Sequence, residues 1–197
     1  MGKLFIIVAP SGAGKTTLVE RLLHNPAAGL CLEKIITYTT RDPRDGEVCG
    51  KDYFFISREE FEEKIKNNFF IEHSFVYNNY YGSSYESIKS QKKENILIAI
   101  FDFKGAQEVK RKTSNAVTIF IEPPTYNVLE QRILKRDADK NTIFLQARLA
   151  ELKKEMNCLP SASFFDYSIS QGLLEDMIFS LGKIIEEESG ALKKDKK

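Results

Sequence analysis

The sequence has little of what secreted, zinc-binding or membrane-spanning proteins need. Its 197 residues include three cysteines, two histidines and no tryptophan. Cys31, Cys49 and Cys158 are odd in number and widely spaced, and none belongs to a Cys-x-x-Cys pair. This pattern argues against a disulfide framework or a zinc site and is typical of a reducing compartment. We therefore expect a cytoplasmic protein.

Long apolar runs and an excess of one charge are also missing. No run approaches the roughly 18 apolar residues of a membrane-spanning helix. The first apolar run begins within three residues of the N-terminus, so we expect no signal peptide. Lysine and arginine number 29 against 28 acidic residues, a net charge of +1. Such a balance creates no field that would attract nucleic acid or membranes, so we expect neither as a partner and any selectivity for anions to be local. The sequence leaves monomer and homo-oligomer open.

What the chain does have is an alternation of buried strands and amphipathic helices. Short, nearly continuous apolar runs predict strands at 4–8, 96–101, 116–121 and 167–169. Apolar residues at three-to-four spacing predict helices at 16–23, 107–112, 128–136, 145–156 and 173–187. The alternation indicates an α/β fold, with a parallel sheet flanked by helices and ligands outside the carboxyl ends of the strands. The length suits a single domain with insertions.

Two segments interrupt this alternation. Residues from about 37 to 92 are rich in Tyr, Asn, Ser and Gly and contain the capping box Ser57-Arg58-Glu59-Glu60. We expect them to form an inserted subdomain, which leaves residues 1–36 and 93–197 for the core. Residues 137–142 are charged and lie between two predicted helices. They could form a mobile lid or an ordinary exposed connection, and the pattern alone favours neither.

A Gly-rich turn follows the first strand and precedes the first helix. It matches the phosphate-binding P-loop pattern G-x-x-x-x-G-K-[ST] except at the first position, which is Ala9. Gly12 and Gly14 can adopt positive φ, so that backbone N–H groups converge on phosphate oxygens at the start of the helix. Lys15 is placed to reach the β- and γ-phosphates and Thr16 to ligate Mg²⁺. The predicted binding residues are Ala9, Pro10, Ser11, Gly12, Ala13, Gly14, Lys15, Thr16 and Thr17.

Further polar groups follow within the predicted insertion. Arg41 and Arg44 lie three residues apart in a turn-forming context, where two guanidinium forks could bind one phosphate. Tyr53, Glu72 and the segment 79–83 supply phenols, a carboxylate and small hydroxyls. Taken singly, each of these residues could equally be ordinary core or surface.

Together the motifs T-T-R-x-P-R-x-G-E, G-K-D-Y, F-I-E and Y-Y-G-S, downstream of a P-loop, resemble the guanylate kinases. The resemblance extends from Lys3 to about Ile185. It implies a P-loop nucleoside monophosphate kinase fold and reversible transfer of the γ-phosphoryl group of ATP to GMP, giving ADP and GDP, with Mg²⁺. It also implies a GMP-binding insertion at about 37–92 and a lid at about 137–147.

The resemblance assigns roles to individual residues. Glu72 would accept hydrogen bonds from guanine N1–H and the amino group, a donor pair that adenine lacks. Thr37 and Ser83 would place hydroxyls near the base, and Asp102 matches a strand-end aspartate of the family. The residues expected around the GMP phosphate are Arg41, Arg44, Tyr53 and Tyr81. Those expected at the ATP phosphates, as catalytic groups, are Lys15, Arg136 and Arg148, with Arg132 a weaker match.

The chain departs from the family pattern at three places. A second aspartate is expected two residues before Asp102, where this chain has Ile100. This leaves Thr16 as the protein's metal ligand. The lid motif R-G-T-D is here Arg136-Asp137-Ala138-Asp139, followed by one additional residue before Arg148. Gln171 stands where the family has Asn.

Two other functions remain compatible with these residues. One is a non-catalytic guanylate kinase-like module that binds proteins, against which the intact Gly14-Lys15-Thr16 argues. The other is a related kinase with another acceptor, such as dGMP or a phosphorylated sugar. Glu72 favours guanine, and use of dGMP besides GMP fits the same residues. The two histidines, His24 and His73, are expected to be structural, because transfer to an existing phosphate needs no general base.

Overall fold

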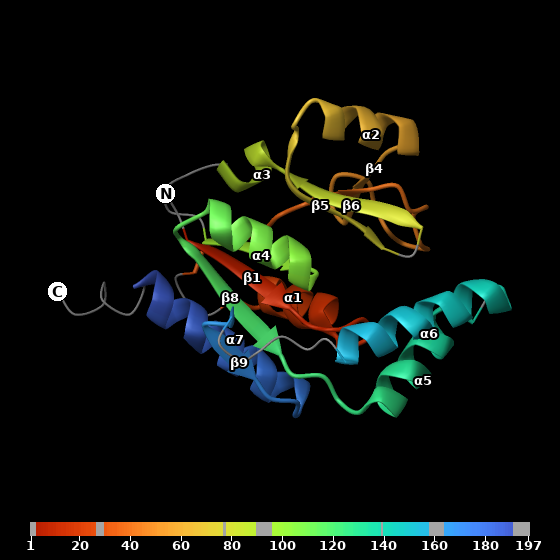
Figure 1. The fold of residues 1–197 in the computed structure, drawn as a ribbon. Helices are drawn as coiled ribbons and strands as arrows, with labels where there is room; N and C mark the ends of the chain where they lie inside the picture. Colours follow the sequence, from red (N-terminus) through yellow and green to blue (C-terminus); the bar gives the residue numbers. More distant parts are fainter. Residues whose placement is uncertain are drawn as a thin grey trace.

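The core of the protein is a five-stranded parallel sheet in the order β2-β7-β1-β8-β9 (Figure 1). The computed structural model describes residues 3–26, 30–76, 78–89, 96–138, 140–157 and 164–190. The strands are β1 (Leu4–Val8), β2 (Leu32–Lys34), β7 (Ile96–Phe101), β8 (Ala116–Ile121) and β9 (Tyr167–Ile169). The central strand β1 pairs with β7 on one side and β8 on the other. The predicted parallel sheet is confirmed.

Helices cover both faces of this sheet, which explains why β1 is apolar throughout. Phe5 and Ile7 pack on one side with α1 (Lys15–His24), α5 (Tyr126–Arg136), α6 (Thr142–Asn157) and α7 (Leu174–Ser189). Leu4 and Ile6 pack on the other side with α4 (Phe103–Lys112). Because successive side chains of a strand point to opposite faces, a strand between two helical layers needs an unbroken apolar run.

A second, four-stranded sheet lies within residues 37–84, in the order β4-β3-β6-β5. Its strands are β3 (Thr37–Thr39), β4 (Tyr53–Phe55), β5 (Phe70–Val76) and β6 (Asn79–Ser84), and its helices are α2 (Arg58–Lys66) and α3 (Tyr85–Lys89). Ser57 caps α2 by accepting a hydrogen bond from the Glu60 N–H at 3.1 Å, as the capping box predicts. Helix α4 packs against β5 and so joins this sheet to the core (Figure 1).

The four predicted strands have the bounds observed, whereas four of the five predicted helices begin earlier than predicted and α7 begins one residue later. Helix α4 starts at Phe103 rather than Gln107, because the Asp102 carboxylate accepts a hydrogen bond from the Gly105 N–H at 2.7 Å and caps the helix. Helix α6 starts at Thr142 rather than Leu145, because Asn141 accepts a hydrogen bond from the Phe144 N–H at 2.9 Å. These capping residues mark the first turns of the two helices, which we did not include in the predicted ranges.

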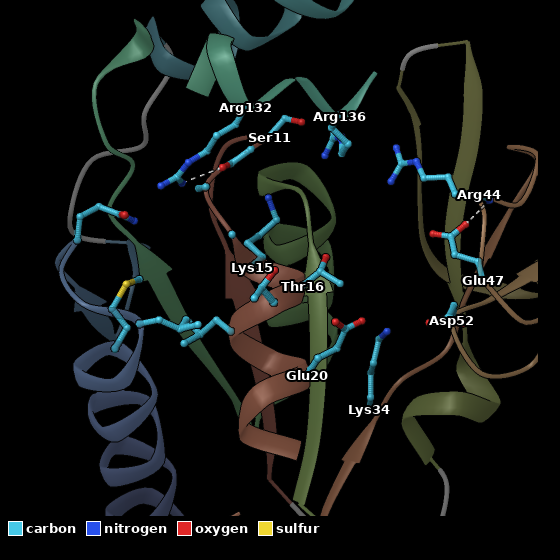
Figure 2. Close-up of a pocket in the computed structure, with 18 of the residues that line it drawn as sticks. Ser11, Lys15, Thr16, Glu20, Lys34, Arg44, Glu47, Asp52, Arg132 and Arg136 are labelled. Atoms are coloured by element: carbon cyan, nitrogen blue, oxygen red, sulfur yellow. Dashed lines mark hydrogen bonds between the residues drawn. The ribbon is translucent and has the colours of Figure 1, made fainter. Parts of the chain in front are cut away.

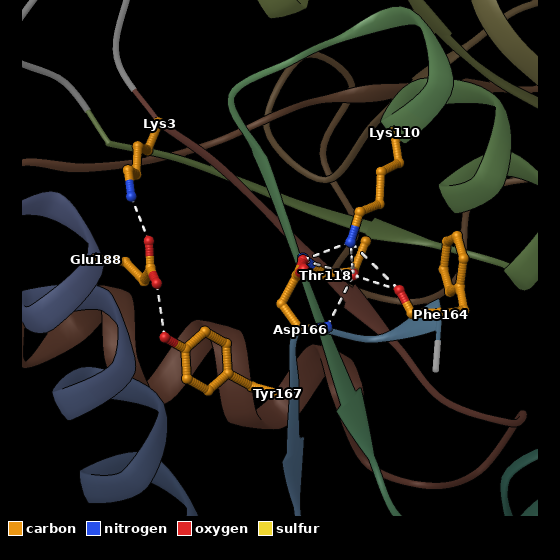
Figure 3. Close-up of polar contacts among 7 residues, drawn as sticks. All are labelled: Lys3, Lys110, Thr118, Phe164, Asp166, Tyr167 and Glu188. Carbon is orange, nitrogen blue, oxygen red and sulfur yellow. Dashed lines mark hydrogen bonds and ion pairs between the residues drawn. The ribbon is translucent and has the colours of Figure 1, made fainter. Parts of the chain in front are cut away.

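Polar contacts hold the start of β9 in place (Figure 3). The Lys110 ammonium group donates hydrogen bonds to Asp166 at 2.6 Å and to Thr118 at 2.9 Å. The Tyr167 hydroxyl donates to Glu188, which also pairs with Lys3. The hydrogen bond to Glu188 raises the pKa of Tyr167 to about 12. These contacts give Asp166 and Tyr167 structural roles.

Two residues named in the sequence analysis, Cys158 and Asp139 of the lid motif, fall outside the described residues. Within the described ranges, no helix is long and apolar enough to cross a membrane.

Candidate active site

The P-loop has the backbone geometry that its glycines predict. Gly12 and Gly14 adopt φ values of +81° and +92°, and Gly14 is the N-cap of α1. These left-handed conformations turn the chain from β1 into the helix, so that N–H groups at the start of α1 face the space above it. Ala9 is buried and is not in a left-handed conformation, so the first position of the motif does not require glycine in this chain.

Lys15 lies among charged groups of both signs. Its ammonium group donates hydrogen bonds to the carbonyls of Ala9 at 2.5 Å and Pro10 at 3.0 Å. Burial lowers the pKa of Lys15 to about 8, and the charges of Arg136 and Arg148 lower it further, whereas Glu155 and Asp102 raise it. An anion bound beside Lys15 would favour the charged form of its ammonium group.

Two helices present further polar groups to the P-loop. From α5, the Arg132 guanidinium donates a hydrogen bond to the Gly12 carbonyl at 3.2 Å. From α6, the guanidinium of Arg148 lies 3.3 Å from the Ser11 hydroxyl. A second α6 residue, Glu155, accepts a hydrogen bond from the Ser11 N–H at 2.8 Å. Arg148 and Glu155 are seven residues apart, and both therefore contact Ser11 from one face of the helix.

A second cationic cluster lies in the loop between β3 and β4. The Glu47 carboxylate accepts hydrogen bonds from the Arg41 side chain at 2.9 Å and from the Arg44 backbone at 2.8 Å. The Arg41 guanidinium lies 5.3 Å from the ring centroid of Tyr53, which is 6.2 Å from that of Tyr81. The structure thus brings together all four residues expected at one phosphate.

The two cationic groups share one cavity of about 620 Å³. The P-loop and α5 form one side, and Arg44, Glu47 and Tyr53 form the other. Figure 2 shows Lys15 on one side of this space and Arg44 on the other, with Arg136 at the top between them. Burial lowers the pKa of Arg44, and the neighbouring Arg41 and Arg136 lower it further. The cavity is therefore suited to phosphate groups arriving from two directions.

Glu72 is buried and is not one of the residues that line this cavity. A register shift in the β5–β6 ladder between Phe70 and Glu72 places three successive buried residues on β5 and pairs Glu72 with Ser83. Such a bulge re-aims side chains, and here the Glu72 carboxylate lies against α4 at Gly105. Burial raises the pKa of Glu72 to about 8, although Ser83 favours the ionised form. Lys112 donates a hydrogen bond to the carbonyl of Ile71, the residue in the bulge.

The surroundings of Thr37, Thr16 and Ile100 say less about the roles of these residues. Thr37 is half-buried in β3, beside Tyr53 of β4. Thr16 is exposed on the first turn of α1, so its hydroxyl could reach a metal ion held by bound phosphates. Ile100 packs against the apolar core. Among the described residues, no group of three or more His, Cys, Asp or Glu side chains could hold a metal ion alone. A metal at Thr16 would thus depend on phosphate and water for most ligands.

Four residues that shape the site were not predicted to do so. Glu47 orients the two loop arginines, Glu155 contacts the P-loop, Asp137 pairs with lid arginines, and Gly105 makes room for Glu72. Glu47 belongs to the motif T-T-R-x-P-R-x-G-E, so the sequence offered a signal for it. The contacts of the other three residues join segments that are distant in the chain, and the sequence carries no signal for them.

The P-loop strand–turn–helix, the parallel sheet and the two-sided cationic cavity define a P-loop phosphotransferase of the nucleoside monophosphate kinase fold. The guanylate kinase family model matches residues 1–188. The chain belongs to the guanylate kinase family.

Individual relatives agree with this assignment. A guanylate kinase of Bdellovibrio bacteriovorus is 38% identical over 186 residues, which cover 94% of this chain and 97% of that protein. One of Escherichia coli O157:H7 is 36% identical over 188 residues, covering 95% and 88%. The crystal structure of guanylate kinase from Anaplasma phagocytophilum superposes with a TM-score of 0.73 at 27% identity, covering 95% of this chain and 86% of that one. The predictions of family, fold class and enzymatic function are confirmed.

Proposed function

We propose that this guanylate kinase binds ATP at the P-loop and GMP between the β3–β4 loop and Glu72, and that Lys15, Arg136 and Arg148 stabilise the transferred phosphoryl group. The observation that carries this assignment of residues is the shared cavity, in which cations from both sides face one space. Lys15, Arg44, Arg132 and Arg136 line this space together, and their cations suit the negative charge of phosphate groups. Two nucleotides would supply that charge.

The ATP side of the cavity begins at the P-loop and ends near α7. N–H groups at the start of α1 would hold the β-phosphate, with Lys15 reaching the γ-phosphate. Gln171, Leu174 and Met177 line the opposite end of the cavity, where the adenine ring would fit. Thr16 would contribute its hydroxyl to Mg²⁺, which supplies charge neutralisation at the phosphates when bound.

The GMP side combines a phosphate site with a site for the base. Arg41, Arg44, Tyr53 and Tyr81 would surround the phosphate. Glu72 would receive the two guanine N–H donors, with Thr37, Ser83 and Asp102 completing the polar surroundings. Because the Glu72 carboxylate is only 4% exposed, a base that leaves it unpaired would lose far more binding energy than it would at a solvated group.

Phosphoryl transfer needs positioning rather than a protein nucleophile or base. An oxygen of the GMP phosphate attacks the γ-phosphorus, and the bond from that phosphorus to the β–γ bridging oxygen breaks, which gives GDP and ADP. Lys15 and the arginines offset the charge that spreads over the transferred group. Closure of the segment 137–147 would exclude water.

We further propose that the single domain is divided into a core, the GMP-binding insertion at 37–92 and the lid at 137–147. A cytoplasmic location stays a prediction.

Gly105→Ala will weaken GMP binding selectively. A Cβ atom at this position would lie 2.7 Å from a Glu72 carboxylate oxygen, closer than van der Waals contact permits, so the carboxylate must move away from the base. We expect the Kd for GMP, measured by calorimetry, to rise about tenfold or more, as for a lost hydrogen bond to a charged group. The Kd for ATP should change less than about twofold, because Glu72 lies outside the predicted ATP residues.

Gly182→Ala is the matched control, because a Cβ there meets only Leu22 at an ordinary 3.7 Å. It should leave both affinities unchanged. An unaltered affinity of the Gly105 variant for GMP, or an equal loss for both nucleotides, would contradict the placement of guanine beside Glu72.

GMP binding will also release a proton near neutral pH. Burial raises the pKa of Glu72 to about 8 in the free protein, so the carboxyl group is mostly protonated at pH 7 and must ionise to accept two guanine donors. Affinity for GMP should therefore rise between about pH 7 and pH 8 and then level off. Calorimetry in two buffers of different ionisation enthalpy measures the released proton. A binding enthalpy that is independent of the buffer would contradict this linkage.

The activity is tested by coupled ADP release with ATP, Mg²⁺ and a panel of GMP, dGMP, AMP, CMP and UMP, with the product identified by chromatography. Turnover confined to guanine nucleotides is the expected result, and use of dGMP fits the same residues. Turnover with AMP at a rate similar to GMP would contradict base selection by Glu72. Folded protein that phosphorylates none of these acceptors would favour the non-catalytic binding module.

A further inference from the structure

A buried carboxylate joins the two arginines that flank the lid. Asp137 immediately follows α5 and is 3% exposed. One of its oxygens lies 3.2 Å from Arg136 Nε, and the other lies 3.0 Å from Arg148 Nε. Arg136 Nη2 adds a contact at 3.3 Å to this second oxygen. One carboxylate therefore connects the end of α5 to α6, across the segment 137–141.

We propose that Asp137 is a positioning residue for phosphoryl transfer, which holds Arg136 and Arg148 together beside the P-loop before ATP arrives. This inference rests on the proposed role of the two arginines at the ATP phosphates. Asp137 touches neither nucleotide in this proposal and acts only through the guanidinium groups.

The contacts favour a positioning role over competition with the nucleotide. Arg136 lines the cavity, whereas Asp137 does not, so an incoming phosphate need not displace the carboxylate. Asp137 engages the Nε side of each guanidinium. The Nη2 group of Arg148 meanwhile lies 3.3 Å from the hydroxyl of Ser11, in the P-loop itself. The arginines can thus keep their buried partner while their outer nitrogens face phosphate oxygens.

Asp137 also offsets repulsion among the positive charges near the P-loop. Arg136 and Arg148 both lie near enough to Lys15 to lower its pKa, so three cations repel one another in the absence of nucleotide. Arg148 is itself only 6% exposed. A buried cation that loses its anionic partner is strongly disfavoured, and it would leave this position or destabilise the fold. Asp137 offsets that repulsion and keeps the cations gathered.

Asp137→Asn tests the proposal because it removes the charge and keeps the shape. We expect the KM for ATP to rise and kcat/KM for ATP to fall about tenfold or more, the size of a lost charged hydrogen bond. The KM for GMP should change less than about twofold. Glu151→Gln, which removes an exposed carboxylate from α6 that pairs with Lys154, is the matched control and should match the wild type.

A double-mutant cycle separates positioning from general loss of stability. In an Arg136→Gln/Arg148→Gln background, Asp137→Asn should change kcat/KM for ATP less than about twofold, because the groups through which it acts are gone. Thermal unfolding shows which variants are folded at the assay temperature. If the Asp137→Asn variant is unfolded at the assay temperature, Asp137→Gly replaces it in the test, since glycine is favoured at the end of a helix.

The outcomes distinguish this inference from the proposed function. If the arginine variants lose activity but both Asp137 variants equal the wild type, or bind ATP more tightly, the positioning role is wrong and the proposed function stands. If the arginine variants keep wild-type kinetics, the proposed role of the arginines fails and the inference fails with it. A GMP-specific defect of the Asp137 variants would also overturn the inference.

Discussion

Lys15→Met will reduce kcat by about a thousandfold or more while the protein stays folded. The ammonium group contacts the P-loop carbonyls of Ala9 and Pro10, and its loss removes charge that the transition state needs more than the bound substrates do. The fold should tolerate the change, because burial already disfavours the charged form and lowers the pKa of Lys15 to about 8. Initial rates with saturating ATP and GMP, together with a thermal unfolding curve, test both expectations.

Lys183→Met is the matched control for this variant. Lys183 is an exposed lysine of α7 that pairs weakly with Glu187 at 3.9 Å, so its replacement removes the same charge far from the proposed chemistry. We expect wild-type rates. Lys15→Met protein that keeps even a tenth of the wild-type kcat would show that this P-loop lysine is not a catalytic group.

Glu72→Gln will separate the two nucleotide sites. The side-chain amide keeps the size of the carboxylate but replaces one acceptor oxygen with a donor that faces the guanine donors. The Kd for GMP should rise about 10- to 100-fold, and the Kd for ATP should change less than about twofold. Glu86→Gln, on the exposed surface of α3, is the control and should alter neither affinity. Equal losses for both nucleotides would place Glu72 outside the base site.

The same variant should be more stable than the wild type at neutral and alkaline pH. The pKa of Glu72 is about 8 in the folded protein, above its ordinary value of 4.5, so the folded state binds more protons than the unfolded state between these pH values. Stability of the wild type therefore falls as pH rises through this window. The Gln variant has no such group. Its advantage in Tm should be small at pH 4 and largest above pH 8, and an advantage independent of pH would contradict the linkage.

The parts of the fold that follow local rules could be predicted from the sequence. Strand β1 is an unbroken apolar run because two helical layers cover it, and its bounds match the prediction. The positive φ of Gly12 and Gly14 follows from the P-loop pattern. The capping box at Ser57 predicts the start of helix α2. Each of these signals lies within a few residues of the structure that it predicts.

Contacts between distant segments could not be predicted in the same way. The bulge at Ile71 that turns Glu72 toward Gly105 depends on pairing with β6 and packing on α4. The attachment of Glu155 to Ser11 joins residues 144 positions apart. Asp137 could be noticed only as a departure from a motif, since its partnership with Arg148 depends on how α6 packs. Tertiary packing decides these features, and residue spacing does not encode them.

A crystal structure of the protein with ADP and GMP bound tests the central claim most directly. The account predicts the ADP phosphates on the P-loop beside Lys15, the GMP phosphate among Arg41, Arg44, Tyr53 and Tyr81, and the guanine edge on the Glu72 carboxylate. It also predicts that Asp137 still pairs with both lid arginines. Guanine bound away from Glu72, or a GMP phosphate that contacts neither Arg41 nor Arg44, would contradict it.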